Sequence, residues 1–264
     1  MRGTGTSAMH SNAWPSGAKP LSLLVTKRKG PPMPAAQPDY VIAPPPQPAL
    51  PIAESTALFP VRRVYCIGRN YAAHAVEMGH DPDREPPFFF QKTPDSLDAS
   101  GRFPYPVMSE DVHHEAELLV ALGKGGENIS EDAALDHVWG YGLALDMTRR
   151  DLQGIAKKAG RPWEIGKSFE HAAPVAPLTP ATTIGHPDAG VMTLTVNGTP
   201  RQQGDLNQMI WKIPEMIAHL SQYYRLAAGD VILTGTPAGV GPVLRGDQLE
   251  LTFDGLTPLR VLVE

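Results

Sequence analysis

The sequence has little cysteine, no long apolar run and no long basic stretch. Its single cysteine, Cys66, cannot form a disulfide within the chain, so nothing indicates an oxidising compartment. A membrane-spanning helix requires roughly 18 consecutive apolar residues, which no segment supplies, and a cytoplasmic protein without a membrane partner is expected. A formal net charge of −5 makes binding of nucleic acid through its phosphates unfavourable. Together these absences favour a small-molecule substrate.

The glycine-rich motifs of nucleotide-binding proteins are also missing. No GxGxxG follows a first strand, and the glycine-rich segment 235–239 lacks the Lys-Ser/Thr ending of a phosphate-binding loop. Nucleotide chemistry is therefore not expected. With 42% hydrophobic residues in 264, the chain can bury a core large enough to fold without disulfides.

The first sixty residues differ in composition from the rest. Residues 1–37 are basic and contain no acid, which predicts a disordered leader. Two origins stay open for it: a start assigned upstream of a true start at Met33, or an organelle-targeting segment. Residues 38–60 are rich in proline, which prevents a helix and predicts a linker or N-terminal arm. A single domain carrying the site is expected over 61–264.

Short strands dominate the pattern of this domain. They are predicted at 61–67, 88–90 (buried), 115–122, 139–147, 192–197, 231–234, 248–253 and 260–263. A hairpin is predicted through Asn197-Gly198, and helices at 70–78, at 133–137 with Ser130 as N-cap, and at 209–223. Because strands and helices do not alternate strictly, we expect an α+β, β-rich fold with antiparallel or mixed sheet.

Two acids alternate along the predicted strand 115–122. Successive side chains of a strand point to opposite faces, so Glu115 and Glu117 share one face and can share a hard cation. Buried without compensation, two carboxylates would be costly, and Mg²⁺ or Mn²⁺ supplies the opposing charge. The alternative is the solvated face of an edge strand, where this pattern is common.

Asp146 ends the apolar run 141–145 and could complete a site of three carboxylates. An oxygen-only site favours Mg²⁺ or Mn²⁺ over Zn²⁺. Zinc is further disfavoured because no Cys or His cluster has its spacing and His113 and His114 would point to opposite faces. The alternative for Asp146 is a cap for a helix beginning near Thr148.

Six segments resemble, in order, the motif series of the fumarylacetoacetate hydrolase superfamily. They are 68–74 (GRNYAAH), 90–92 (FQK), 115–117 (EAE), 146–148 (DMT), 166–168 (GKS) and 229–237 (GDVILTGTP). The resemblance covers 61–264, and its spacing is most similar to the fumarylpyruvate hydrolase and acylpyruvase members. It implies a mixed β-roll of the family's C-terminal-domain type and a homodimer.

The resemblance also implies roles for individual residues. It places Mg²⁺ or Mn²⁺ on Glu115, Glu117 and Asp146, in agreement with the strand-face argument. It implies that His74, oriented by Glu77 three residues later on a short helix, is a general base for water. Taken alone, a histidine at this place would more often be a surface or core residue.

Further roles follow from the same resemblance. Lys167 is implied to be catalytic, steadying an oxyanion or a substrate carboxylate, with a surface lysine as the alternative. Substrate contacts are implied for Arg69, Tyr71, Arg150, Gln153 and Thr236. For Arg69 and Tyr71, packing or structural hydrogen bonding stays open as the alternative.

The implied activity is hydrolysis of a carbon–carbon bond in an acylpyruvate, a small diketo acid. The best match is cleavage of fumarylpyruvate to fumarate and pyruvate in aromatic catabolism through gentisate. Two alternatives use the same site: decarboxylation of oxaloacetate, and isomerisation or decarboxylation of a hydroxy-diene dioate. A catalytically silent binding protein of the same fold is the non-enzyme alternative.

Overall fold

The computed structural model describes residues 39–72 and 86–264. Residues Pro45–Glu264 form one compact unit, and residues 39–44 belong to a separate one. The predicted leader, His74, Glu77 and most of the predicted helix 70–78 lie outside the described residues.

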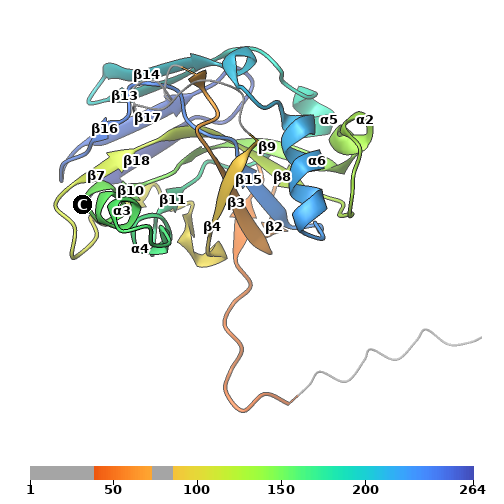
Figure 1. Ribbon diagram of the computed structural model, residues 1–264, viewed down its shortest axis with the longest axis horizontal. Helices are drawn as coiled ribbons and strands as arrows, with labels where there is room; N and C mark the ends of the chain where they lie inside the picture. Colours follow the sequence, from red (N-terminus) through yellow and green to blue (C-terminus); the bar gives the residue numbers. More distant parts are fainter. Residues whose placement is uncertain (1–38, 73–85) are drawn as a thin grey trace, which may run out of the picture. The chain divides into compact units, whose positions relative to one another are not determined.

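A six-stranded mixed sheet forms the centre of the compact unit (Figure 1). Its strands, in spatial order, are β12 (Thr179–Pro180), β9 (Val138–Leu145), β8 (Ala116–Leu122), β15 (Asp230–Leu233), β3 (Arg63–Gly68) and β4 (Phe88–Lys92). Only β15 and β3 run parallel in this sheet; the other neighbours are antiparallel. The arrangement places β8, with its acids, in the interior of the sheet.

A second sheet of five strands packs against one face of the first. Its order is β14 (Thr199–Asp205), β13 (Val191–Val196), β17 (Gln248–Thr252), β18 (Leu259–Val263) and β6 (Arg102–Phe103). The predicted hairpin between β13 and β14 is confirmed, with Asn197 and Gly198 at φ 52° and 76°. Positive φ at both central residues is typical of a type I′ turn, which suits the twist of paired strands.

Smaller sheets and short helices complete the unit. The short strands are β1 (Ala49–Pro51) with β2 (Leu58–Pro60), β10 (Thr148–Arg149) with β7 (Val112–His114) and β16 (Gly241–Pro242), and β11 (Ala173–Pro174) with β5 (Leu97–Asp98). The α-helices are α2 (Glu131–Ala134), α3 (Arg150–Lys158), α4 (Glu164–Lys167), α5 (Ala181–Ile184) and α6 (Ile213–Tyr223). The 3₁₀ turns are η1 (Pro94–Ser96), η2 (Leu135–His137) and η3 (Leu206–Gln208). In Figure 1, α3 and α4 lie on the opposite side of the unit from α2 and α6.

Side chains of the six-stranded sheet alternate between two cores. Along β8, Leu118 packs into the core shared with the second sheet and α6, whereas Leu119 packs into a core on the opposite face. The second core is covered by Leu50 and Phe59 from β1 and β2. The predicted β-rich fold is confirmed, and both faces of the sheet are buried. Among the described residues, no helix is long and apolar enough to cross a bilayer.

Three local predictions need correction. The strand at 88–90 exists but is not buried, because β4 is an edge strand and Phe88 is 40% exposed. Ser130 occupies the N-cap position of α2, yet its side chain makes no capping hydrogen bond. The helix predicted from 209 begins at Ile213, because Pro214 lacks the N–H that a helix needs beyond its first turn.

Candidate metal centre and pocket

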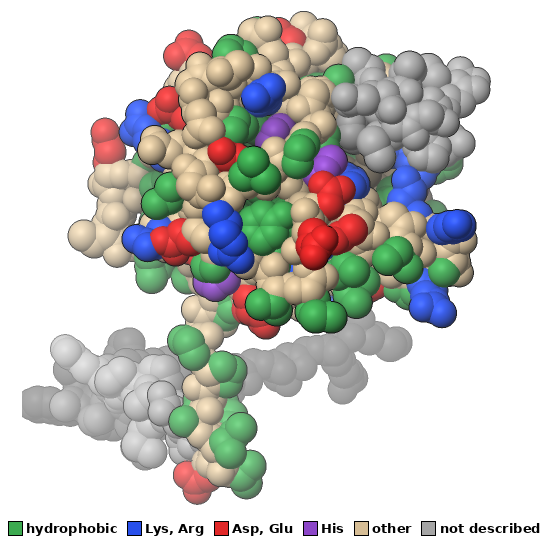
Figure 2. All heavy atoms as spheres, turned by 90° about the vertical axis from the view of Figure 1, so that its left-hand side faces the viewer, with side chains coloured by type: hydrophobic (Ala, Val, Ile, Leu, Met, Phe, Trp, Pro, Cys, Tyr) green, Lys and Arg blue, Asp and Glu red, His purple; other side chains and the backbone are tan. Residues whose placement is uncertain are grey.

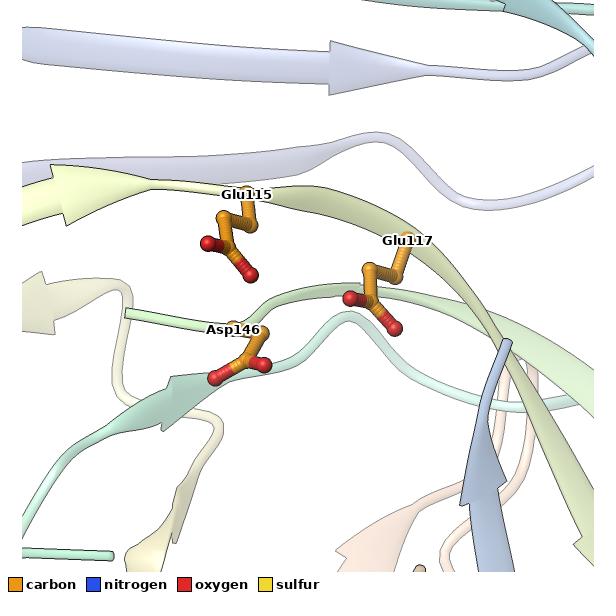
Figure 3. A group of neighbouring side chains, drawn as sticks. All are labelled: Glu115, Glu117 and Asp146. Carbon is orange, nitrogen blue, oxygen red and sulfur yellow. The ribbon is translucent and has the colours of Figure 1, made fainter. Parts of the chain in front are cut away.

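Glu115, Glu117 and Asp146 converge at one end of the six-stranded sheet (Figure 3). Glu117 lies near the start of β8, Glu115 directly before that strand, and Asp146 directly after β9. Because β8 and β9 are antiparallel neighbours, the start of one lies beside the end of the other. One carboxylate oxygen from each acid lies within 4.8 Å of the other two, and all three side chains are buried. The alternatives of a solvated edge and of a helix cap at Asp146 are therefore wrong; the N-cap position of α3 is Arg149.

Three cationic side chains compensate part of this buried negative charge. Lys167 Nζ lies 2.7 Å from Glu115 Oε2 and 2.7 Å from Asp146 Oδ2. Lys92 Nζ lies 2.8 Å from Asp146 Oδ1, and Arg150 donates to Glu115 Oε1. Since a buried carboxylate without a partner is costly, these contacts offset the cost of burying Glu115 and Asp146.

The remaining features of the cluster fit a hard divalent cation. Burial, with the charges of Asp146 and Glu115, raises the pKa of Glu117 well above its usual range. Its Oε2 accepts a hydrogen bond from Gly235 N at 2.7 Å. Within the described residues, Asp146 Oδ1 contacts Lys92 but makes no hydrogen bond, which leaves a buried lone pair for another cation. Oxygen donors alone are the preference of Mg²⁺ and Mn²⁺, so the cluster could bind either ion.

Lys167 is buried, so the alternative of a surface lysine is wrong. Burial would lower the pKa of Lys167, but the carboxylates of Asp146 and Glu115 outweigh burial and raise it. The neighbouring glycine explains how α4 brings this lysine to the cluster. A Cβ on Gly166 would lie 2.9 Å from Gln153 N, so a larger residue would force α4 away from α3.

A pocket with an empty volume of about 480 Å³ opens beside the three acids. Arg150 and Gln153 line it from one face of α3, and Arg150 Nη1 donates to Gln153 Oε1 at 2.7 Å. Arg69 and Thr236 line it from the loops after β3 and β15. Of the predicted substrate residues, these four border the pocket.

Tyr71 does not line the pocket. Its side chain is buried, and its hydroxyl has no hydrogen-bond partner within residues 39–72 and 86–264. The alternative role in packing fits Tyr71 better than substrate contact does, since its ring packs beside Gly204 of β14.

Two side chains that hold this site together, Lys92 and Gln202, were not predicted to have a role. Lys92 is the last residue of the motif 90–92 (FQK). A lysine that ends an apolar strand beginning with three phenylalanines indicates a buried cation, and this pattern could have predicted its role. Gln202 of β14 has no such signal, because all its partners lie in other elements. Gln202 Oε1 lies 3.0 Å from Ala116 N and 2.9 Å from His114 Nδ1. Gln202 Nε2 donates to Thr236 Oγ1 at 2.8 Å and to Pro237 O at 2.9 Å.

Charged side chains of both signs are distributed over the visible surface. On the face shown in Figure 2, Lys and Arg side chains lie in several separate places among acidic and apolar ones. A continuous basic surface, as nucleic-acid binding requires, is not seen on this face.

Solved and curated relatives are similar over most of the chain. A crystal structure of fumarylpyruvate hydrolase from Pseudomonas aeruginosa, in complex with Mn²⁺ and pyruvate, is 48% identical with a TM-score of 0.83. The match covers 85% of this chain and 99% of that one. Oxaloacetate tautomerase YcgM of Escherichia coli is 44% identical over 200 residues, 75% of this chain and 90% of that protein. The mitochondrial oxaloacetate decarboxylase of Dictyostelium discoideum is 42% identical over 197 residues, 74% of this chain and 90% of that protein.

These relatives are named as enzymes, and the fold and the buried acids agree with the motifs found in the sequence. The family model described as fumarylacetoacetate (FAA) hydrolase C-terminal matches residues 63–264, which include every residue of the pocket. The chain therefore belongs to the fumarylacetoacetate hydrolase family.

Proposed function

We propose that this chain is a divalent-metal-dependent hydrolase that cleaves the bond between carbons 3 and 4 of an acylpyruvate such as fumarylpyruvate. The observation that carries the proposal is the buried cluster of Glu115, Glu117 and Asp146 with Lys167 beside it. When bound there, Mg²⁺ or Mn²⁺ would supply a Lewis acid that neutralises charge on a 2-oxo acid. Pyruvate, found with Mn²⁺ in the similar Pseudomonas enzyme, is one product of this reaction.

Lys167 is suited to stabilise the enolate that such cleavage produces. An ammonium group has three N–H donors, and two of them are used by Glu115 and Asp146. The third is left for a substrate oxygen on which negative charge develops. A donor fixed in a buried site needs little reorganisation when the charge appears, which is the source of its effect on the rate.

His74 and Glu77 are proposed as the water-activating pair on the resemblance alone. His74 takes a proton from water, and the water oxygen bonds to carbon 4. Collapse breaks the bond between carbons 3 and 4 and leaves its electron pair on carbon 3 as the enolate of pyruvate, which then takes up a proton. General-base assistance typically contributes about 10²- to 10⁴-fold, so His74→Ala should lose that much turnover and keep Mn²⁺ binding. Loss of Mn²⁺ binding in a folded variant would contradict this role.

A second candidate is conversion of oxaloacetate, by tautomerisation or decarboxylation. The relatives at 44% and 42% identity support it, and both reactions pass through an enolate of the same 2-oxo acid end. Lys167 would serve in the same way, so the residues around the metal do not separate the two activities.

The deciding experiment follows ultraviolet absorbance of fumarylpyruvate, acetylpyruvate and oxaloacetate with metal-free protein, before and after Mg²⁺ or Mn²⁺ is restored. Loss of fumarylpyruvate absorbance with formation of pyruvate, abolished by EDTA, is the expected result. Conversion of oxaloacetate alone, as enol–keto exchange or CO₂ release, would replace the hydrolase proposal with the second candidate. The implied homodimer and cytoplasmic location stay predictions; light scattering tests the dimer.

A further inference from the structure

The pocket contains more cationic side chains than form ion pairs with its carboxylates. Arg150 and Lys167 pair with Glu115 at the metal centre. Arg69 and Lys157 line the same pocket and are less buried than the three acids. Within the described residues, neither forms an ion pair with a carboxylate. Two cations in one pocket that pair with no carboxylate of the described residues indicate a place for an anionic group.

An aromatic wall holds both cations without neutralising them. The Arg69 guanidinium carbon lies 5.8 Å from the centre of the Phe88 ring, and Lys157 Nζ lies 5.7 Å from that of Trp163. The two rings touch each other edge to face, with centres 5.0 Å apart. Cation–π contact orients a charged group but leaves its hydrogen-bond donors available. Both donors therefore belong to one continuous section of the pocket wall.

The backbone at Arg69 is held in a costly conformation. Its φ of 57° lies in the left-handed region, which a residue with a Cβ rarely adopts. The next residue, Asn70, is fully buried and fixed by hydrogen bonds: Nδ2 donates to Thr234 O at 2.8 Å, and Oδ1 accepts from Trp211 N at 2.7 Å. Strain of this kind persists where surrounding contacts impose it, and it is found at binding sites. Here it directs Arg69 into the pocket.

Helix α3 sets the distance between the two ends of the pocket. Arg150, Gln153 and Lys157 follow each other at intervals of three and four residues, so they share one face of the helix, and all three line the pocket. Arg150 contacts Glu115 at the metal centre, and Lys157 lies seven residues further on, about 10 Å along the helix axis.

This spacing suits a long substrate better than a short one. With carbon–carbon bonds of about 1.5 Å, the terminal carbons of an extended four-carbon diacid lie about 4 Å apart. In a seven-carbon diacid they lie about 7 to 8 Å apart. The longer molecule spans more of the distance between the acids and Lys157 than the shorter one does. Burial and the positive charges of Arg69 and Arg150 lower the pKa of Lys157, so a bound anion would relieve the repulsion among them.

We propose that Arg69 and Lys157 form a subsite for a second carboxylate at the far end of the substrate. The pocket then selects 2-oxo diacids of about seven carbons over monocarboxylates and over four-carbon diacids. The inference rests on the proposed function in one respect, that the 2-oxo acid end of the substrate binds at the metal centre.

The test compares two ligands of equal length by calorimetry on the full chain loaded with Mn²⁺. 2-Oxoheptanedioate carries the distal carboxylate, and 2-oxoheptanoate carries a methyl group in its place. A charge-assisted hydrogen bond is worth enough to favour the diacid about tenfold or more in the unsubstituted protein. Lys157→Met keeps the length and the apolar stem of the side chain and should reduce this preference to about twofold or less. Lys158→Met changes the adjacent exposed lysine and should leave the preference intact.

Equal affinity for the two ligands, or no measurable binding of the diacid, would overturn the subsite. So would a preference that survives Lys157→Met in a protein whose circular dichroism is unchanged. Failure of the proposed hydrolase activity is a separate result: the diacid would still be preferred, but no acylpyruvate would be consumed when metal is restored.

Discussion

Gln202 fixes the direction of a hydroxyl group in the pocket. Its Oε1 must face the Ala116 N–H and its Nε2 must face the Pro237 carbonyl, so backbone groups determine which end of the amide is which. Thr236 Oγ1 therefore accepts from Nε2, and its own hydrogen is available to a substrate oxygen. The same orientation requires His114 to carry its proton on Nδ1.

Gln202→Leu should therefore weaken both the fold and the binding of a 2-oxo acid. The Ala116 N–H and the Pro237 carbonyl would lose a buried partner, at about 1 to 3 kcal/mol for each unsatisfied group. Denaturant unfolding measures the stability, and calorimetry with a 2-oxo acid measures the affinity. Gln203→Leu is the matched control, because Gln203 is the next residue of β14 and is exposed. Equal losses in the two variants would contradict the role given to Gln202.

Asp146 is the acid of the cluster that contacts two lysines. Asp146→Asn keeps the shape of the side chain but leaves Lys92 and Lys167 facing a neutral amide, so their charges would repel a divalent cation. We expect Mn²⁺ affinity to fall at least about 100-fold in calorimetry, because loss even of a group that only orients a metal ligand costs about 10- to 100-fold. Asp132→Asn, on the exposed face of α2, is the control. Retained Mn²⁺ affinity in Asp146→Asn would remove Asp146 from the proposed ligands.

At the scale of elements, patterns within one segment were more informative than patterns that depend on distant partners. The central strands and the hairpin turn follow from apolar periodicity and from Asn197-Gly198. The acids follow from the alternation of Glu115 and Glu117 and from the place of Asp146 after an apolar run. The strands β1 and β2 were missed, because they form by pairing with each other and through Pro51 O of β1, which accepts from Leu178 N at 2.9 Å. The local composition, which is rich in proline, did not indicate this pairing. Lys157 was missed for the same reason, since its importance depends on Trp163 and Arg69.

Two glycines without close neighbours separate backbone effects from packing. A Cβ added to Gly198 or to Gly154 would meet no atom of the described residues within 4 Å. Gly198 has φ 76°, so Gly198→Ala should destabilise the protein by about 1 kcal/mol. Gly154 lies within α3, so Gly154→Ala should stabilise it by up to about 1 kcal/mol. Unfolding in denaturant measures both, and a shift of the same sign in the two variants would contradict the assigned turn or helix.

At the scale of the molecule, the second core depends on the N-terminal arm. Leu50 and Phe59 are buried against the sheet face that includes Leu119, and the Phe59 ring lies 5.2 Å from that of Trp139. Losing a single buried leucine or phenylalanine side chain costs about 2 to 5 kcal/mol, and a whole domain is typically stable by only about 5 to 15 kcal/mol. The arm therefore contributes much of the burial that excludes water from this face of the sheet.

Two truncations determine where the folding unit begins. Residues 45–264 correspond to the compact unit, so this chain should unfold at the same denaturant concentration as the full protein. Residues 61–264, the domain predicted from the sequence, lack the cover of the second core and should be unfolded or aggregated. Phe59→Ala in the longer chain should be destabilised by about 3 to 5 kcal/mol, and Leu58→Ala, at a residue 62% exposed, by much less. If 61–264 proves as stable as 45–264, the arm is dispensable for folding. The sheet face would then need another cover, such as a second copy of the chain. Light scattering at the same concentration would detect that dimer.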